Sequence, residues 1–377
     1  MGLWFIDRFR HIDWFIVTAA SVIAILGIFT MYGFSDGGGV GKRQIVWLII
    51  SLGVFFATSQ FEYRVLRRTG VVIGIYGSTL LLLVLVTILG NVVKGAQSWF
   101  SFGFASFQPT DLAKLALIFL LAKYLAKRHV EIAHIRHIIV SGMYALIPTV
   151  LVLMQPDLGS ALVLSGIWFC LVLVSGISKK HLALVIGGAL ISFILAWMFV
   201  FAPYQKDRIK TFIDPLSDIR GSGYNVYQSQ IAIGSGGVLG KGVGFGTQSR
   251  LEFLPEHQTD FIFAAFSEEW GFIGVFVLLS LFLLLIWRLL LIALRAASNF
   301  ELFCVLGVLF FFLIHIVVNV GMNLGIMPVT GIPLPFMSYG GSHLLTEWLA
   351  LGVIMGMRKY ERTAHRDKLN YEFLGVE

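Results

Sequence analysis

The chain has 377 residues, of which 57% are hydrophobic and 13% are charged, and its mean hydropathy is +0.85. This composition excludes an ordinary soluble globular protein and predicts an integral membrane protein. We interpret the net charge of +7 as anchoring of loops against the membrane, not as a nucleic-acid site.

Apolar runs of about twenty residues, the length at which a helix crosses a bilayer, follow one another along the chain. They predict an all-α polytopic membrane protein, with residues 1–377 as a single domain. In chain order, the ten predicted transmembrane helices cover residues 14–34, 44–60, 71–90, 112–126, 137–154, 158–176, 181–202, 262–287, 302–325 and 341–357. The first run is longer than the apolar part of a signal peptide, so we expect it to be retained.

The predicted orientation follows from Lys and Arg, which are concentrated in the connections on the side of the N-terminus. An even number of helices puts both termini on that side, so both are expected to be cytoplasmic. Three long connections then lie outside, namely residues 91–110, residues 326–340 and the large loop 203–261 between the seventh and eighth helices. Long ordered loops on one face usually carry function.

Two of these outer connections have unusual composition. Residues 326–340 contain three prolines and no charge, so we expect them to fold back between helices with their backbone shielded by protein. The glycine-rich stretch 234–246 departs twice from the Walker phosphate-loop pattern. Its glycines are therefore expected to permit tight turns and close approach of backbone to a helix or ligand, while Lys241 could meet an anion.

Two pairs of polar side chains occur within predicted helices. Asp111 and Lys114 are three residues apart, on one helical face, and are expected to pair. They form either a structural contact or the wall of a polar cavity. His343 and Glu347 are four residues apart and form either a buried mutual hydrogen bond or a proton relay. Cys170 and Cys304 lack metal-ligand spacing and are interpreted as small buried hydrophobes.

Residues 251–272 contain five acids and neither Lys nor Arg. Among them Asp260 follows Thr259 at a predicted junction between the large loop and the eighth helix. Such an acid can cap a helix N-terminus, hold a cation or act as a general base. The loop before it is basic, which offers cations for a phosphate beside a carboxylate that can accept a proton; its basic residues include Lys206, Arg208, Lys210 and Arg220.

Motifs spread over the whole chain resemble the SEDS family of shape, elongation, division and sporulation proteins. Near residues 246–264 they are more similar to its elongation members than to its division members. In order, the motifs are KGAQSWF at 94–100, FQPTDLAKLA at 107–116, QPDLGSAL at 155–162, YQKDRIKTFIDP at 204–215, GYNVYQSQIAIGSGGVLGKG at 223–242, GTQSRLEFLPEHQTDFIFA at 246–264 and GIPLPFMSYGGS at 331–342.

The resemblance implies a peptidoglycan glycosyltransferase that polymerises lipid II at the outer face of the bacterial cytoplasmic (inner) membrane. It implies a class B penicillin-binding protein as partner, beside the nascent glycan strand and other membrane proteins of the elongation complex. The rival hypotheses are a flippase or transporter for the same lipid, and a non-catalytic scaffold for the penicillin-binding protein.

The resemblance also assigns roles to individual residues. It implies that Asp260 is catalytic and that Asp111 and Lys114 are functionally important. We expect Asp260 to deprotonate the acceptor sugar, and Arg208 and Lys241 to meet the pyrophosphate, directly or through a divalent cation, Mg²⁺ or Mn²⁺. Three further candidates for substrate binding are Gln248, Glu256 and Thr259.

The chain departs from its relatives at three positions. Relatives usually carry His where Gln258 stands, Glu where Asp111 stands and, in many cases, Arg where Ser98 stands. His257 is one residue away from the usual His. We therefore expect that position to serve packing or hydrogen bonding beside Asp260, which an amide supplies as well as an imidazole.

Overall fold

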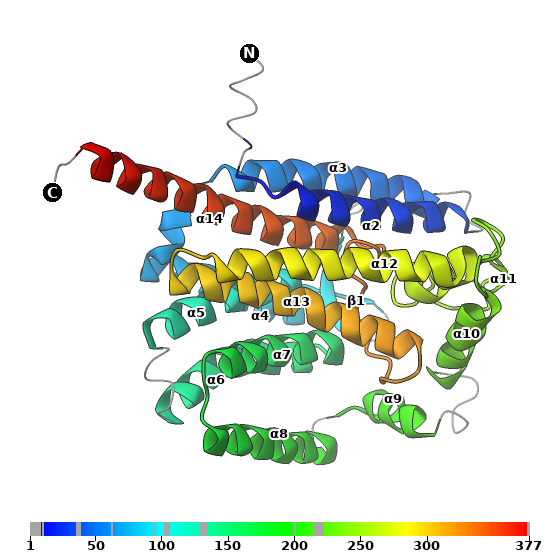
Figure 1. The fold of residues 1–377 in the computed structure, drawn as a ribbon. Coiled ribbons are helices and arrows are strands. Elements are labelled where there is room, and N and C mark those ends of the chain that lie inside the picture. The colour runs from blue at the N-terminus through cyan, green and yellow to red at the C-terminus, as the bar shows by residue number, and fades with distance from the viewer. Residues whose placement is uncertain are drawn as a thin grey trace.

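The computed structural model describes residues 9, 11–34, 39–61, 63–93, 96–101, 106–128, 135–199, 201–214 and 222–374. Long helices dominate it and run side by side (Figure 1). A helix stands at each of the ten predicted positions: α2 (Trp14–Tyr32), α3 (Gly39–Ser59), α4 (Thr69–Leu89), α5 (Pro109–Arg128), α6 (Ile135–Met154), α7 (Leu158–Val174), α8 (Lys179–Phe199), α12 (Ile262–Leu294), α13 (Asn299–Asn323) and α14 (Gly341–Leu374).

Seven helices of the described chain are long and apolar enough to cross a membrane by length and composition alone. The polytopic all-α class is thereby confirmed, while the count of ten spans stays a prediction. Of the remaining three, α7 is apolar but shorter, with 17 residues, and α5 and α14 carry several charged residues.

The hydrophobic core lies between α2, α5, α7, α12, α13 and α14, whose facing side chains form one buried cluster. Helix α5 is central to it, and residues from Leu115 to Leu125 are almost all buried. Helix α8 is the opposite case, because none of its side chains is buried and it runs along the edge of the molecule in Figure 1.

The predicted loop 91–110 contains a small sheet, which the sequence reading did not anticipate. Strands β1 (Asn91–Val93), β2 (Ala96–Ser101) and β3 (Ser106–Phe107) pair antiparallel in the order β1-β2-β3. The pairing satisfies backbone groups locally in a connection that leads directly into α5.

The described part of the large loop 203–261 contains the helices α9 (Pro203–Ile213), α10 (Ser222–Ser235) and α11 (Thr247–Arg250). A 3₁₀ helix, η1 (Tyr63–Arg67), lies between α3 and α4. In Figure 1, α10 and α11 lie at one end of the bundle, beside the start of α12, and α9 lies below them. We call this end the Asp260 end.

At the other end, which we call the Asp13 end, a buried carboxylate joins the first helix to two later ones. Asp13 caps α2 by accepting a hydrogen bond from the Phe15 N–H at 3.2 Å. The same carboxylate accepts from Arg288 Nε of α12 at 3.2 Å and from Arg358 Nη1 of α14 at 3.1 Å. Since an unpaired buried carboxylate is costly, this contact fixes three helices at one level.

Helix α12 is broken near its beginning, at Gly271, whose φ of 64° and ψ of −165° are not helical. This conformation is open to glycine and strained for other residues. The break frees backbone groups on both sides, and the glycine-rich loop after α10 takes them up. Lys241 N and Gly242 N donate to the carbonyls of Glu268 and Glu269, and Phe272 N and Ile273 N donate to those of Gly237 and Val238.

The glycines of this loop permit the contact, as the sequence predicts. A Cβ added to Gly236 would lie 2.1 Å from the carbonyl oxygen of Ser267, and one added to Gly240 would lie 2.1 Å from that of Glu269. Both distances are far below van der Waals contact, so the loop backbone approaches α12 more closely than a side chain would allow.

Candidate active site

Asp260 lies in a tight turn that precedes α12, half-buried at the Asp260 end. The turn, residues 256–261, is closed by hydrogen bonds from Thr259 N and Phe261 N to the carbonyl of Glu256, both at 3.1 Å. Helix α12 begins at Ile262 with Phe261 as its N-cap, and the side chain of Phe261 makes no cap hydrogen bond. The N-cap position thus belongs to Phe261, one residue after Asp260, and the capping alternative for Asp260 stays a prediction.

Two buried asparagines of α13 fix the backbone of Asp260. The side-chain amides of Asn319 and Asn323 each donate to the carbonyl oxygen of Asp260 at 3.0 Å. Asn319 also donates to the carbonyl of Ile332 at 2.8 Å, and Asn323 accepts from Ala264 N at 3.2 Å. The main chain at Asp260 is thus held by two neutral donors from one helix.

The segment 326–340 packs against the same turn, largely buried, as predicted. Ser338 Oγ donates to the carbonyl of Thr259 at 2.7 Å, and Tyr339 N donates to the carbonyl of Gln258 at 2.9 Å. Gly331, at a φ of 74°, lies beside the Asp260 carboxylate, since a Cβ added there would come 3.5 Å from Asp260 Oδ2.

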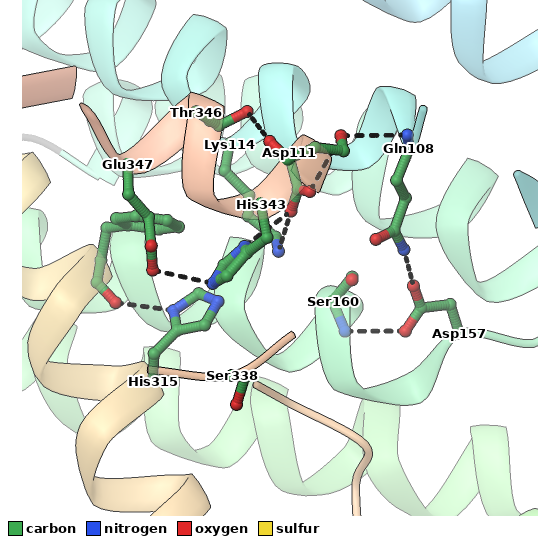
Figure 2. Close-up of polar contacts among 12 residues, drawn as sticks. Gln108, Asp111, Lys114, Asp157, Ser160, His315, Ser338, His343, Thr346 and Glu347 are labelled. Carbon is green, nitrogen blue, oxygen red and sulfur yellow. Dashed lines mark hydrogen bonds and ion pairs between the residues drawn. The ribbon is translucent and has the colours of Figure 1, made fainter. Parts of the chain in front are cut away.

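A second polar site, which we call the buried charge network, joins α5 to α14 (Figure 2). Lys114 Nζ donates to Asp111 Oδ1 at 3.0 Å, and both side chains are buried. The predicted pairing is confirmed. His343 Nδ1 lies 3.3 Å from the same oxygen, and His343 Nε2 lies 2.9 Å from Glu347 Oε1. The latter is an ion-pair distance, although the angles are not those of a hydrogen bond.

The two predicted pairs are therefore one network of two carboxylates, one ammonium and one imidazole. His343 and Glu347 are in contact as expected, but not with the geometry of the expected hydrogen bond, and the proton relay stays a prediction. His315 stacks beside it, with ring centroids 5.1 Å from His343, and hydrogen-bonds to the carbonyl of Phe311 at 2.8 Å.

A short stretch of seven residues, 336–342, touches both sites. Phe336 N donates to Glu347 Oε2 at 2.8 Å, and Ser342 Oγ lies 3.5 Å from Asp111 Oδ2. Between them, Ser338 holds the Asp260 turn. The backbone that positions Asp260 is thus continuous with the backbone that the buried charge network fixes.

The neighbouring acids of α12 organise the large loop. Glu268 is fully buried and accepts from Lys241 Nζ at 2.7 Å, from Thr247 N at 2.9 Å and from Gln248 N at 3.1 Å. Glu269 Oε1 accepts from Gly244 N at 2.9 Å. The anion that Lys241 meets in the structure is thus Glu268.

The other sequence-predicted residues occupy distinct places. Glu256 and Thr259 contact each other within the Asp260 turn, with Thr259 Oγ1 donating to Glu256 Oε2 at 3.0 Å. Gln248 has a buried side-chain oxygen without a hydrogen-bond partner in the described part of the chain. Arg208 of α9 lines a cavity of about 60 Å³ with residues of α10 and Met327.

His257 is buried and lies edge-on against the ring of Phe34, with centroids 4.3 Å apart. Its Nδ1 bonds to the carbonyl of Leu254 at 2.9 Å. These contacts are those of a packed side chain. They agree with the expectation that His257 is not a catalytic group, while the packing or hydrogen-bonding role expected for Gln258 stays a prediction.

Sequence reasoning missed the two asparagines of α13. The available signal is weak but present, because an amide within an apolar span needs a partner, and Asn319 and Asn323 share one helical face by their spacing. No group of three or more His, Cys, Asp or Glu side chains able to hold a metal occurs among the residues that the structure describes.

Comparisons with known proteins agree with this arrangement. The family model described as cell cycle protein, covering FtsW, RodA and SpoVE, matches residues 9–363. Peptidoglycan glycosyltransferase MrdB of Escherichia coli K12 is 38% identical over 326 residues, covering 86% of this chain and 87% of that protein. Stage V sporulation protein E of Bacillus subtilis 168 is 36% identical over 344 residues, covering 90% and 93%.

Solved structures show the same fold. A chain from a study of the structural coordination of polymerization and crosslinking by a peptidoglycan synthase complex superposes with a TM-score of 0.79 at 34% identity, covering 93% of this chain and 98% of that one. The rod shape determining protein RodA of Thermus thermophilus gives a TM-score of 0.70 at 32% identity, covering 93% and 97%. With this coverage, the chain belongs to the FtsW, RodA and SpoVE family of cell cycle proteins.

Proposed function

We propose that the chain is a peptidoglycan glycosyltransferase of cell-wall elongation, which polymerises lipid II with Asp260 as the general base. The observation that carries the proposal is the way in which the structure holds Asp260. Two buried asparagines hold the main chain of Asp260, while its half-buried carboxylate lies beside Gly331. The names of the relatives support the same activity.

In the proposed reaction, Asp260 accepts the proton of the 4-hydroxyl of the acceptor GlcNAc. The hydroxyl oxygen forms a bond to C1 of the donor MurNAc as the bond from C1 to undecaprenyl pyrophosphate breaks, with inversion at C1. A positioned base contributes about 10²–10⁴ in rate to such a step. The rigid backbone of the turn serves this role, because it keeps the carboxylate in one place.

Cations are needed where the pyrophosphate leaves. We assign Arg208 to this role first, since it lines a cavity beside Met327 of the segment that continues to Gly331. Lys241 stays a second candidate, because its side chain is 29% exposed although it is paired with Glu268. Glu256, Thr259 and Gln248 are proposed to contact the sugars.

A divalent cation would be held by the substrate as well as by protein. Mg²⁺ is commonly bound through one or two carboxylates together with phosphates, and the described residues build no larger cluster of ligands. Asp260 and Glu256 are the acids of the turn that could contribute. Such a cation would neutralise charge on the leaving pyrophosphate.

The membrane location and the partner follow from the same proposal. The chain is a membrane protein with several apolar helices, and we place it in the bacterial cytoplasmic membrane with the Asp260 end outside. The chain to which it is similar in fold comes from a peptidoglycan synthase complex. This supports a class B penicillin-binding protein as the partner that crosslinks the strands.

The test is polymerisation of lipid II by the purified full chain in detergent, where no membrane has to be crossed. Asp260→Asn should lower the rate about 10²–10⁴-fold with an unchanged unfolding temperature. Asp207→Asn, which changes an exposed carboxylate of α9, is the matched control and should retain full activity. Glycan yield from Asp260→Asn close to that of the unchanged chain would remove Asp260 from the reaction.

A further inference from the structure

The glycine-rich loop between α10 and α11, residues 236–246, carries large apolar side chains that no part of the described chain covers. Leu239 is 79% exposed, Phe245 68% and Val238 65%. Apolar exposure on a transmembrane helix is ordinary because lipid covers it. On a loop it calls for a separate explanation.

The level of this loop in the membrane can be derived from α2. That helix has 19 residues, which at about 1.5 Å per residue is about 29 Å, close to the ~30 Å hydrocarbon core of a bilayer. Its beginning is fixed at Asp13 by Arg288. Beyond its end, Gly33 packs against Gly244 and the Glu269 carboxylate, because an added Cβ would come 2.9 Å and 2.5 Å from their atoms.

The loop therefore lies at the boundary between the hydrocarbon core and the headgroups at the Asp260 end. It is also bonded to the break in α12 at that level, through Phe272 and Ile273. Both residues are exposed, as is Phe276 one turn further along. Leu239 and Val238 thus lie beside the exposed apolar face of α12 and enlarge it.

Contact with lipid requires that backbone polar groups are bonded within the protein, and part of the loop backbone meets this requirement. Hydrogen bonds to protein acceptors are made by the backbone N–H groups of residues 236, 240, 241, 242, 244 and 245. One cation, Arg250, is exposed nearby, where it suits anionic headgroups.

We propose that the loop 236–246 is an interfacial membrane anchor, which inserts Leu239, Val238 and Phe245 into the lipid at the Asp260 end. Residues 247–260 follow directly, so the anchor sets the height at which the Asp260 turn stands above the hydrocarbon core. The proposal concerns the position of the loop, and it holds or fails independently of the reaction that Asp260 performs.

The test measures the depth of nitroxide labels in the full chain, reconstituted in vesicles of phosphatidylcholine and phosphatidylglycerol. Cys170→Ser and Cys304→Ala first remove the native thiols. Leu239→Cys and Phe245→Cys are then labelled singly. Collision with oxygen, which concentrates in lipid, is compared with collision with a water-soluble nickel complex. Phe276→Cys on α12 is the lipid control, and Lys210→Cys on the exposed side of α9 is the water control.

The labels at residues 239 and 245 should collide with oxygen more than with nickel, as the label at 276 does, and at a shallower depth. Collision mainly with nickel, as at 210, would overturn the proposal and leave the patch to a protein partner. Protection from both reagents would overturn it as well, since protein and not lipid would then cover the loop.

Discussion

Carboxylates have different surroundings at the Asp260 turn and in the buried charge network. In the network, Asp111 and Glu347 are buried and contacted by Lys114 and His343. At the turn, two neutral amides bind the backbone of Asp260, and the residue is half-buried. The network joins two helices through buried charged partners, whereas the turn fixes the main chain of a half-buried acid.

Lys114→Ala should have the largest effect on stability, because it leaves Asp111 with one partner fewer inside the protein. Loss of one member of a buried pair typically costs about 3–5 kcal/mol. Thermal unfolding of the purified chain measures it, with Lys127→Ala at the exposed end of α5 as control. Full activity and an unchanged unfolding temperature would show that the network does not hold the helices.

Exchanging the two residues, Asp111→Lys with Lys114→Asp, sharpens this test. If the network were only a pair, the exchange would restore stability. Since His343 and Ser342 also contact Asp111, the exchange places an ammonium against an imidazole and should restore little. Recovery to the level of the unchanged chain would mean that His343 contributes nothing.

Asn319→Ala should lower activity more than stability, because it removes one of the two amides that bind the Asp260 carbonyl. Removing one partner of a buried group costs about 1–3 kcal/mol, and the lost positioning adds to the effect on kcat. The measurement is kcat for lipid II polymerisation beside the unfolding temperature, with Val317→Ala on the same helix as control. If kcat falls only as far as the lost stability accounts for, Asn319 has a structural role alone.

Gly331→Ala tests whether the space beside the carboxylate matters. The positive φ of 74° makes a side chain cost about 1–2 kcal/mol, and the new Cβ would lie 3.5 Å from Asp260 Oδ2. We expect a moderate loss of kcat with a small loss of stability. Gly53→Ala, where an added Cβ meets nothing within 4 Å, should change neither; equal behaviour of the two variants would count against a role for Gly331.

His257→Ala should have the smallest effect. The side chain packs on Phe34, so its loss should cost about 1 kcal/mol of stability, as an average substitution does, and leave kcat unchanged. Gln258→His should be nearly neutral in both measurements. A fall in kcat after His257→Ala comparable to that of Asp260→Asn would make His257 a second catalytic group.

The helices and the two local pairs could be predicted because their signals are local. An apolar run determines a membrane helix, and spacings of three or four determine which side chains share a face. The sequence could not predict that the two pairs join into one network, since Asp111 and His343 are 232 residues apart. The same holds for Asn319 and Asp260, and for the break at Gly271, which depends on a loop that arrives from elsewhere in the sequence.

The acids that made residues 251–272 conspicuous illustrate the limit. Composition marked the stretch as functional but could not rank its members. In the structure Glu268 and Glu269 hold the large loop, while Asp260 stands at the turn. Partners that come from distant parts of the chain made the distinction, not the local sequence.

The contact of Asp13 with Arg288 and Arg358 has a consequence for biosynthesis. The cations follow the carboxylate by 275 and 345 residues, and a ribosome adds about 5–20 residues per second. For roughly 15–55 s the nascent first helix therefore has neither guanidinium partner. The link that completes the fold thus forms only when the last helix has been made, so an unfinished or truncated chain exposes a polar defect at its first helix, which membrane quality control could recognise.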